Sequence, residues 1–570
     1  MGIRTCGVAR LDWPAVTSLR DARNSVNTPP DHLKKQAKEL LALYRHDDPE
    51  AITRFREALP VAAGKSDTAI AALGLRLHDA QSCIAREYGF ASWADLQGFV
   101  LARRAQAEDP AKALLHWLRL VYAGDIAGGP NGARPSVAAR LLEENPALPG
   151  DDAWLACAVG NEAAVRQAIA QDPAWVHRAG GPLALPPLVA VTHSGLMQLP
   201  AFRDGLRACA KLLLDAGASP DQSAGNRWPP ASLEQPSETE RLSALYGAAG
   251  RNHDAALTRL LLDAGANPDD GESLYHALDS LPCTRLLLEA GARVTGSNAM
   301  YRVLDLDAVD TLRLLLAHGG DASEKPLGEP SAEWGSPLLW AIRRRRSPAH
   351  IEALLAAGAD PKATTRDGTR AHTVALRFGL TDVARLLEAA GGGDAPLAAD
   401  EAFIAACARG DEAAARQVLA NHPGLISTLG ETQLRLLPEL AAQGCNDAVQ
   451  VMASLGWPIE VRGGDWDGSA LNHAVFNGNA ALAGFLLAHG ADWRAMHGFG
   501  DNVIGTLSWA SLNEPAAGGD WVGCAQALFA HGMPTVRPDP ENPDGVLVGT
   551  HHGRFSDEVT DYLLGAFAQR

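Results

Sequence analysis

Short runs of leucine and alanine recur along the chain, and many of them end two residues before a glycine. The seven residues LLLDAGA occur twice, at 212–218 and at 260–266. Leucines at adjacent positions and one turn apart place their side chains on one face of a helix. A glycine just after the helix adopts the left-handed conformation that ends it without strain. The pattern therefore predicts amphipathic helices that end beside Gly217 and Gly265.

The same helix end occurs at many further sites, and proline replaces glycine at three of them. Between positions 358 and 490 the markers are separated by 33, 32, 33 and 34 residues. This period is typical of a unit that consists of one turn and two helices. Such units bury their apolar faces only against their neighbours, so the spacing predicts a stacked array. The markers stand at 146, 173, 217, 265, 291, 319, 358, 391, 423, 456, 490 and 532.

The segment DGSALNHAVFNGNAALAGFLLAHGAD (467–492) contains a complete unit, and the chain resembles ankyrin-repeat proteins in these residues. The family's unit is a β-turn finger, a first helix that opens with Thr-Pro-Leu-His or a relative, and a second helix that ends in Leu-Leu-x-x-Gly-Ala. GSPLLWAI and LSALYGAAGRNH are similar openings. The resemblance covers roughly 135–570. It implies an all-α fold class, an ankyrin-repeat solenoid with short β-turn fingers.

The positions of these markers predict the domain organisation. Residues 1–27 form an N-terminal extension, 28–124 a small helical N-terminal module, 135–390 a first ankyrin block, and 398–570 a second block with a C-terminal cap. In the module, Thr28, Asp48 and Ser92 are predicted to cap the starts of helices. We interpret the module as a cap that shields the first repeat, with a partner-binding role of its own as the alternative.

Departures from the regular period predict local differences within the array. The short intervals between 265 and 319 leave almost no room for projecting hairpins, so 266–300 should lack them. Inserts at 192–205 and 511–520 fall between the two helices of a unit. The segments 219–240 and 323–335 are rich in proline and acidic residues, and they are predicted to form loops on the finger side.

Composition and charge exclude several classes of function. The net charge of −17 argues against nucleic acid as a partner, because phosphate binding requires a basic surface. No apolar run approaches 18 residues, and the eight cysteines are scattered singly, so we expect a soluble cytoplasmic protein that does not span a membrane. HExxH, GxSxG and paired metal-ligand spacings do not occur. LPVAAGKS (59–66) ends like a phosphate loop but lacks its first glycine and the preceding strand. We therefore predict no catalytic, cofactor or metal site.

The resemblance implies where a partner would bind, because ankyrin proteins usually bind partners in the groove between the fingers and the first helices. Exposed aromatic residues beside arginines are typical of protein-binding hot spots. AIRRRRSP (341–348) adds Arg343 and Arg344, which could contact acidic residues of a partner or simply form a solvated helix end or pair with acidic loops. Transferred to this chain, the finger positions are Trp334, Arg366, Trp466 and Phe499, and the first-helix edge positions are Arg251, Phe378, Phe476 and Trp509.

These inferences predict a non-enzymatic scaffold that binds a protein partner through the concave ankyrin groove, with the aromatic residues between 457 and 509 as the preferred face. One alternative is a small-molecule or catalytic site in a pocket between the N-terminal module and the first repeats, covered by the inserts at 179–205 and 219–240. A second alternative is a regulator whose 28–124 module contacts nucleic acid through Lys34, Lys35 and Lys38.

Overall fold

The structure is a computed structural model that describes residues 30–108, 110–326, 334–393, 396–540 and 545–568. The described chain is mostly helical, as predicted, with a few short strands. It is divided into two compact units, 1–299 and 300–570, which are considered separately below. The predicted helix cap Thr28 lies outside the described residues.

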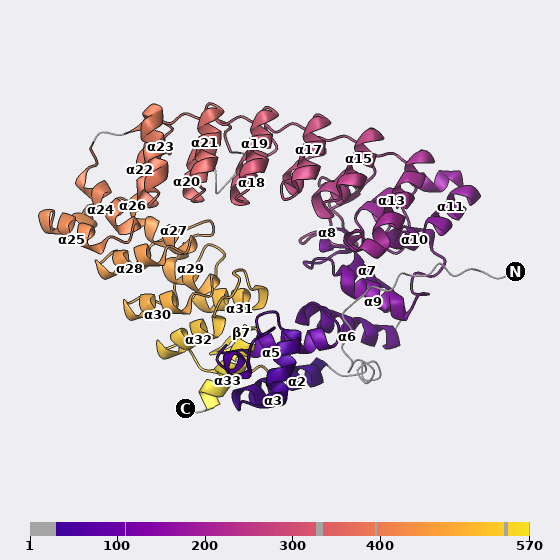
Figure 1. Cartoon of the computed structure of the whole chain (residues 1–570), viewed down its shortest axis with the longest axis horizontal. Helices are drawn as coiled ribbons and strands as arrows, with labels where there is room; N and C mark the ends of the chain where they lie inside the picture. Colours follow the sequence, from indigo (N-terminus) through magenta and orange to yellow (C-terminus); the bar gives the residue numbers. More distant parts are fainter. Residues whose placement is uncertain (1–29, 109, 327–333, 394–395, 541–544, 569–570) are drawn as a thin grey trace. The chain divides into compact units, whose positions relative to one another are not determined.

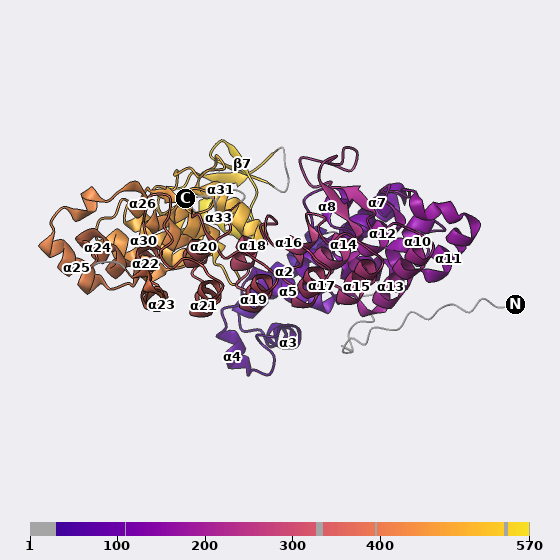
Figure 2. The ribbon, with the colours of Figure 1, turned by 90° about the horizontal axis from the view of Figure 1, so that it is seen from above.

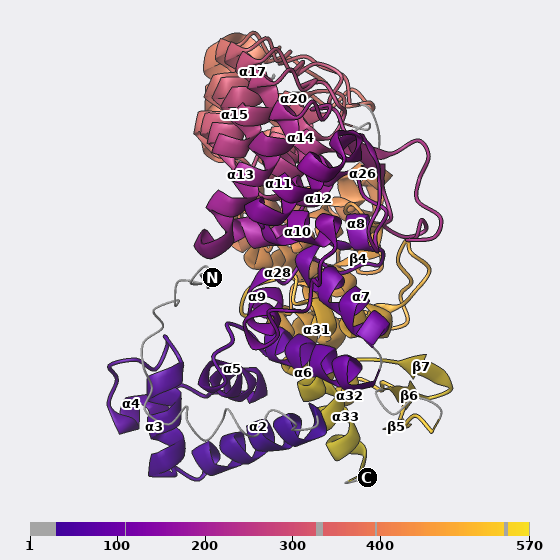
Figure 3. The same cartoon turned by 90° about the vertical axis from the view of Figure 1, so that its right-hand side faces the viewer.

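Unit 1 begins with a group of helices in which α2 contacts α3 and α5 (Figure 3). The Asp48 carboxylate accepts hydrogen bonds from the backbone N–H groups of Glu50 and Ala51, both at 3.0 Å, and caps α3. Ser92 Oγ accepts from the Asp95 N–H at 3.1 Å ahead of α6. Both predicted helix starts are therefore confirmed. The helices are α2 (Pro30–Arg45), α3 (Pro49–Ala58), α4 (Asp67–Ala71), α5 (Leu77–Glu87), α6 (Trp93–Glu108) and α7 (Pro110–Val121).

The rest of unit 1 consists of short helices in which α13 contacts α15 and α15 contacts α17 (Figure 1). Of the insert predicted at 192–205, only 193–199 lies between two helices, because α13 already begins at Pro200. The segment 219–240 contains β1, and its part 226–240 leads from β1 to β2. Residues 266–300 contain no strand, and the structure describes all of them. The elements are α8 (Gly124–Ala127), α9 (Pro135–Glu144), α10 (Ala153–Val159), α11 (Glu162–Gln171), η1 (Pro173–His177), α12 (Pro187–Thr192), η2 (Gly195–Gln198), α13 (Pro200–Asp215), β1 (Ser223–Gly225), β2 (Arg241–Ser243), α14 (Ala244–Tyr246), η3 (Gly247–Arg251), α15 (Ala255–Asp263), α16 (Ser273–Ala277) and α17 (Leu281–Glu289).

In unit 2, α18, α20 and α22 form one row and α19, α21 and α23 a second row (Figure 2). Contacts continue from α27 to α29 to α31, and from α28 to α30 to α32. The elements are α18 (Ala299–Asp305), α19 (Val309–Ala317), α20 (Pro337–Arg343), α21 (Pro348–Ala356), α22 (Ala371–Arg377), α23 (Thr381–Leu387), η5 (Glu388–Gly392), α24 (Ala399–Ala408), α25 (Glu412–Asn421), η6 (Leu425–Thr428), α26 (Glu431–Leu434), α27 (Leu436–Ala442), α28 (Asn446–Ser454), β3 (Arg462–Gly463), β4 (Gly468–Ser469), α29 (Ala470–Phe476), α30 (Ala480–Ala488), α31 (Val503–Asn513), α32 (Trp521–Ala530), β5 (Val536–Pro538), β6 (Val546–Val548), β7 (His551–Gly553) and α33 (Asp557–Ala568).

The glycines that mark the predicted helix ends all have a left-handed backbone. All nine have φ between 84° and 98°, a conformation in which a residue with a Cβ atom would be strained. Gly217 and Gly265, which end the repeated heptapeptide, both have a φ of 92°. The pattern of leucines followed by glycine therefore identified these helix ends correctly.

The C-terminal strands were not predicted. β5, β6 and β7 form an antiparallel three-stranded sheet, and α33 contacts β5. His551 and His552 both belong to β7. The apolar run in β6, which is buried at all three positions, is too short for its period to distinguish a strand from a helix.

Candidate functional site

Five rings in unit 2 lie one against the next and form what we call the aromatic face: Trp466, Phe476, His497, Phe499 and Trp509. The Trp466 ring lies 5.1 Å from His497 and 5.6 Å from Phe476, measured between ring centroids. Phe476 stacks on Trp509 at 5.4 Å with an interplanar angle of 8°. His497 lies 6.0 Å from Phe499. Four residues that were predicted from separate segments are therefore joined into one surface.

The local backbone places these rings in turns and near the ends of helices. Trp466 lies in the turn between β3 and β4, two antiparallel strands of two residues each. Phe499 lies in a second turn. Phe476 is the last residue of α29, and Trp509 lies near the C-terminal end of α31. The face thus combines turn residues with residues at the ends of helices.

Much of the aromatic face is open to solvent. Phe499 is 83% exposed and Trp509 is 52% exposed, and Met496 and Leu512 are also among the exposed large apolar residues. Clustered exposed apolar side chains of this kind are typical of interaction surfaces, whereas isolated ones are common everywhere.

Trp466 is held against two glycines that leave no room for a side chain. A Cβ atom on Gly468 would lie 2.8 Å from the Trp466 ring, and one on Gly498 would lie 2.9 Å from the Trp466 carbonyl oxygen. His473 packs edge-on against the ring, with 4.5 Å between the ring centroids, and its own ring nitrogen is 2.9 Å from the Gly463 carbonyl. The orientation of Trp466 is therefore set by close packing.

Asp465, the residue before Trp466, belongs to an ion-pair cluster that holds it in place. Arg343 is 2% exposed, and its guanidinium lies 3.0 Å from Glu439 and 2.6 Å from Asp465. Arg344 lies 2.7 Å from Asp465 and 2.8 Å from Asp305. Burial opposes ionisation of Asp465, but the two arginines outweigh it and hold the pKa of this carboxyl below its ordinary value.

The role predicted for the arginines of AIRRRRSP therefore has to be corrected for Arg343. Its side chain has no surface to offer a partner, because two carboxylates of the same unit already bind it and the Trp334 ring covers it at 5.3 Å. The alternative role, pairing with acidic residues of the chain itself, is the one observed for Arg343, and its partners are Glu439 and Asp465. Trp334 also contacts Phe378 at 6.0 Å, and Phe378 is buried. Arg366 is exposed in the turn before Arg370.

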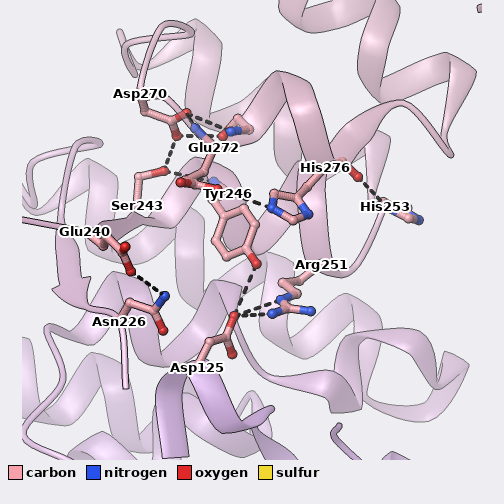
Figure 4. Close-up of polar contacts among 11 residues, drawn as sticks. Asp125, Asn226, Glu240, Ser243, Tyr246, Arg251, His253, Asp270, Glu272 and His276 are labelled. Carbon is pink, nitrogen blue, oxygen red and sulfur yellow. Dashed lines mark hydrogen bonds and ion pairs between the residues drawn. The ribbon is translucent and has the colours of Figure 1, made fainter. Parts of the chain in front are cut away.

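The remaining predicted residue, Arg251, takes part in a polar cluster of unit 1 that we call the Asp125 joint: Asp125, Tyr246 and Arg251. One oxygen of the Asp125 carboxylate accepts a hydrogen bond from Tyr246 Oη at 3.2 Å and from Arg251 Nε at 2.9 Å (Figure 4). Arg251 Nη2 binds the same oxygen. Asp125 is 3% exposed, and its other oxygen has no partner among the described residues. Arg251 is therefore occupied by the chain itself.

The surroundings of the Asp125 joint are closed by the insert at 219–240. Arg227 is buried, and its guanidinium donates to the carbonyls of Ile126 at 2.6 Å and Leu183 at 2.8 Å. Behind Tyr246 lies His193, whose ring nitrogen is 2.9 Å from the Ser243 carbonyl. Burial lowers the pKa of His193 and raises the pKa of Tyr246, so both groups are neutral at pH 7. The joint connects parts of unit 1 that lie far apart in the sequence.

One cavity of about 290 Å³ lies near the N-terminal module, where the alternative hypothesis places a pocket. It is lined by Asp95, Gly132, Ala133, Arg134, Pro135 and Ser136. Asp95 and Arg134 pair with each other at 3.0 Å, and the lining contains no aromatic side chain. Ligand pockets are usually lined mainly by apolar and aromatic groups. The pocket hypothesis stays a prediction.

No group of three or more His, Cys, Asp or Glu residues suited to a metal ion occurs within the described ranges. Within the same part of the chain, we find no helix with the length and apolar character needed to span a membrane. In the N-terminal module, Lys35 pairs with Glu39 at 3.7 Å, which weakens the basic patch that the nucleic-acid alternative requires.

Sequence reasoning missed His497, which connects Phe499 to Trp466, and Asp125, which binds Arg251. His497 carries a signal in hindsight, since it stands two residues before Phe499 in a glycine-rich turn. Asp125 carries none, because 126 residues separate it from Arg251. A scan against protein-family models and a search of curated proteins find nothing that matches this chain.

Proposed function

We propose that the chain is an ankyrin-repeat protein that acts as a non-enzymatic cytoplasmic scaffold and binds a protein partner through the aromatic face. One observation supports this proposal most directly. Rings from two turns and two helices meet in a continuous row, and Phe499 and Trp509 in that row are largely exposed. Trp residues at the centre of a packed cluster are the side chains that most often dominate binding energy at protein interfaces.

The rigidity of the face is a second argument for binding. Trp466 is packed against Gly468 and Gly498, and the adjacent Asp465 is held by two arginines. A preformed surface loses little conformational entropy when a partner binds, so more of the contact energy appears as affinity. The repeat assignment itself is supported by the left-handed glycines at the predicted helix ends and by the contacts of successive helices.

Peptide selection on the purified full-length chain tests this proposal without a known partner. Random dodecapeptides displayed on phage are selected on the immobilised chain and then measured on variants. We expect the selected peptides to bind Trp509→Ala and Trp466→Ala roughly tenfold more weakly, or worse, because these rings carry the contact. Trp228→Ala is the matched control, since Trp228 is 43% exposed but belongs to unit 1. Equal binding to the wild type and to Trp509→Ala contradicts the proposal.

A further inference from the structure

The aromatic face offers hydrogen-bond donors that the chain leaves unused. Among the described residues, none accepts a hydrogen bond from the indole N–H of Trp466 or of Trp509. The Trp466 nitrogen is not fully buried, and the Trp509 residue is 52% exposed. By contrast, the buried Trp457 donates to the Leu434 carbonyl at 2.9 Å, and Trp340 donates to Asp305 at 3.1 Å. The two open indoles can therefore donate to carbonyl oxygens of a bound segment.

This pattern of polar groups favours an extended partner segment over a helical one. In a helix the backbone carbonyls are bound within the helix, so the indoles would find few acceptors. The exposed rings Phe499 and Trp509 and the neighbouring Met496 and Leu512 carry no strong acceptor for partner N–H groups, and the carboxylates of Asp501 and Glu514 lie at the rim. Proline has a carbonyl but no N–H, so a proline-rich segment matches the apolar part of this surface, which has indole donors but no strong acceptor.

The geometry of the rings agrees with the same class of partner. Phe476 and Trp509 lie almost parallel, and Trp466 is tilted by 42° against Phe476, so the rings form a ridged surface. Proline-rich segments form a preformed left-handed helix with three residues per turn, whose rings dock between aromatic side chains at low entropic cost.

Two carboxylates beside the rings add a charge requirement. Asp501 lies two residues after Phe499, and Glu514 follows α31 beyond Leu512; both are exposed. Neither pairs with a lysine or arginine within the described ranges. Two arginines lie nearby: the Arg554 carbonyl accepts from Ser508 Oγ, and Arg462 acts on His497 but is paired with Asp467. Because Asp467 neutralises Arg462, the two carboxylates outnumber the remaining positive charge, so the rim favours a basic residue in the partner.

We propose that the aromatic face binds a proline-rich, extended segment of a partner protein that carries arginine or lysine beside its prolines. This inference rests on the proposed function and specifies its ligand. Proline rings contact Trp509 and Phe499, partner carbonyls accept from the indoles of Trp466 and Trp509, and the basic residue lies near Asp501 and Glu514.

The peptides selected on the full-length chain test the inference by their composition. We expect enrichment of proline together with arginine or lysine, compared with a selection on Trp509→Ala. One enriched peptide is then synthesised in three fluorescent forms: as selected, with its prolines changed to alanine, and with its basic residues changed to glutamate. We expect both altered forms to bind at least about tenfold more weakly. Asp501→Asn with Glu514→Gln should abolish the difference between the basic and the acidic form.

The outcomes separate this inference from the proposed function. Selected peptides that lack proline but still require Trp509 overturn the inference and leave the aromatic face as a binding site. If the peptide with its prolines changed to alanine binds as tightly as the selected peptide, the inference is overturned in the same way. Selected peptides that bind Trp509→Ala as tightly as the wild type overturn both. Circular dichroism of each variant verifies that the loss of binding does not come from unfolding.

Discussion

The Asp125 joint of unit 1 and the aromatic face of unit 2 both contain residues that were predicted to lie at the same place, the edge of a first helix. Arg251, Phe476 and Trp509 were all assigned to the edge of a first helix. In unit 1 the carboxylate of Asp125 covers this edge. In unit 2, Trp509 remains 52% exposed.

The comparison teaches that a position at the end of a helix specifies where a side chain lies but does not specify what covers it. Arg343 makes the same point within unit 2, since it stands at the end of a helix and is nevertheless buried by Glu439 and Asp465. A charged residue at such a position attracts an opposite charge from its own chain. Among the aromatic residues assigned to this edge, Trp509 remains exposed, whereas Phe378 is buried.

The largest effect is expected from Arg343→Leu in the covered part of unit 2. Removing the guanidinium leaves Glu439 buried without its counter-charge, which costs about 3–5 kcal/mol of unfolding free energy. Urea denaturation measures the loss, and hydrogen–deuterium exchange localises it to α27 and α29. Arg385→Leu is the control, because its ion pair with Asp382 is largely exposed and contributes a few tenths of a kcal/mol or less. A loss for Arg343→Leu no greater than for the control contradicts the assignment.

A smaller effect is expected from Asp125→Ala in unit 1. The change removes the acceptor of Tyr246 and Arg251, but the Arg251 side chain is 38% exposed, so water screens its charge. We expect a loss of about 1–2 kcal/mol, confined to unit 1 in hydrogen exchange. Asp204→Ala is the control, since that carboxylate is almost fully exposed. Exchange that increases equally in both units contradicts a local role for the joint.

The stability of unit 1 should also depend on pH, through His193. Burial lowers the pKa of His193, while Asp125 and Asp270 oppose this shift and Arg251 adds to it. The folded state therefore binds fewer protons than the unfolded state once the pH falls below the ordinary value of about 6.5. Unit 1 should lose stability as the pH falls from that value towards the lower folded pKa. His193→Asn should reduce this slope in denaturation experiments at pH 7.5 and 5.5, and an unchanged slope indicates that His193 is charged in the folded protein.

The smallest effect on stability is expected at the open face. Trp509→Ala removes a stacked contact with Phe476 from a half-exposed position, so the unfolding free energy should fall by only about 0.5–1 kcal/mol. The same variant should show the largest loss of peptide binding. Denaturation and fluorescence polarisation on one preparation compare the two effects. A stability loss as large as that of Arg343→Leu indicates that Trp509 serves the fold more than a partner.

Much of the fold could be predicted because it depends on local rules. The glycines after the leucine runs have the left-handed conformation that the sequence required, and Asp48 and Ser92 cap the predicted helices. The strands at the C-terminus could not be predicted, since a run as short as Val546–Val548 has no distinguishable period. The candidate aromatic residues were found by position alone, and His497 was missed because its role is to connect two of them in space.

The sequence by itself determined the helix ends, the helical character of the chain and the set of aromatic residues at turns and helix termini, because backbone conformation and amphipathic pattern are local properties. Only the tertiary structure decided which of these residues stay open. Asp125 meets Arg251 across 126 residues, and Glu439 meets Arg343 across 96. Pairings at such separations depend on the packing of distant helices, which no local pattern encodes.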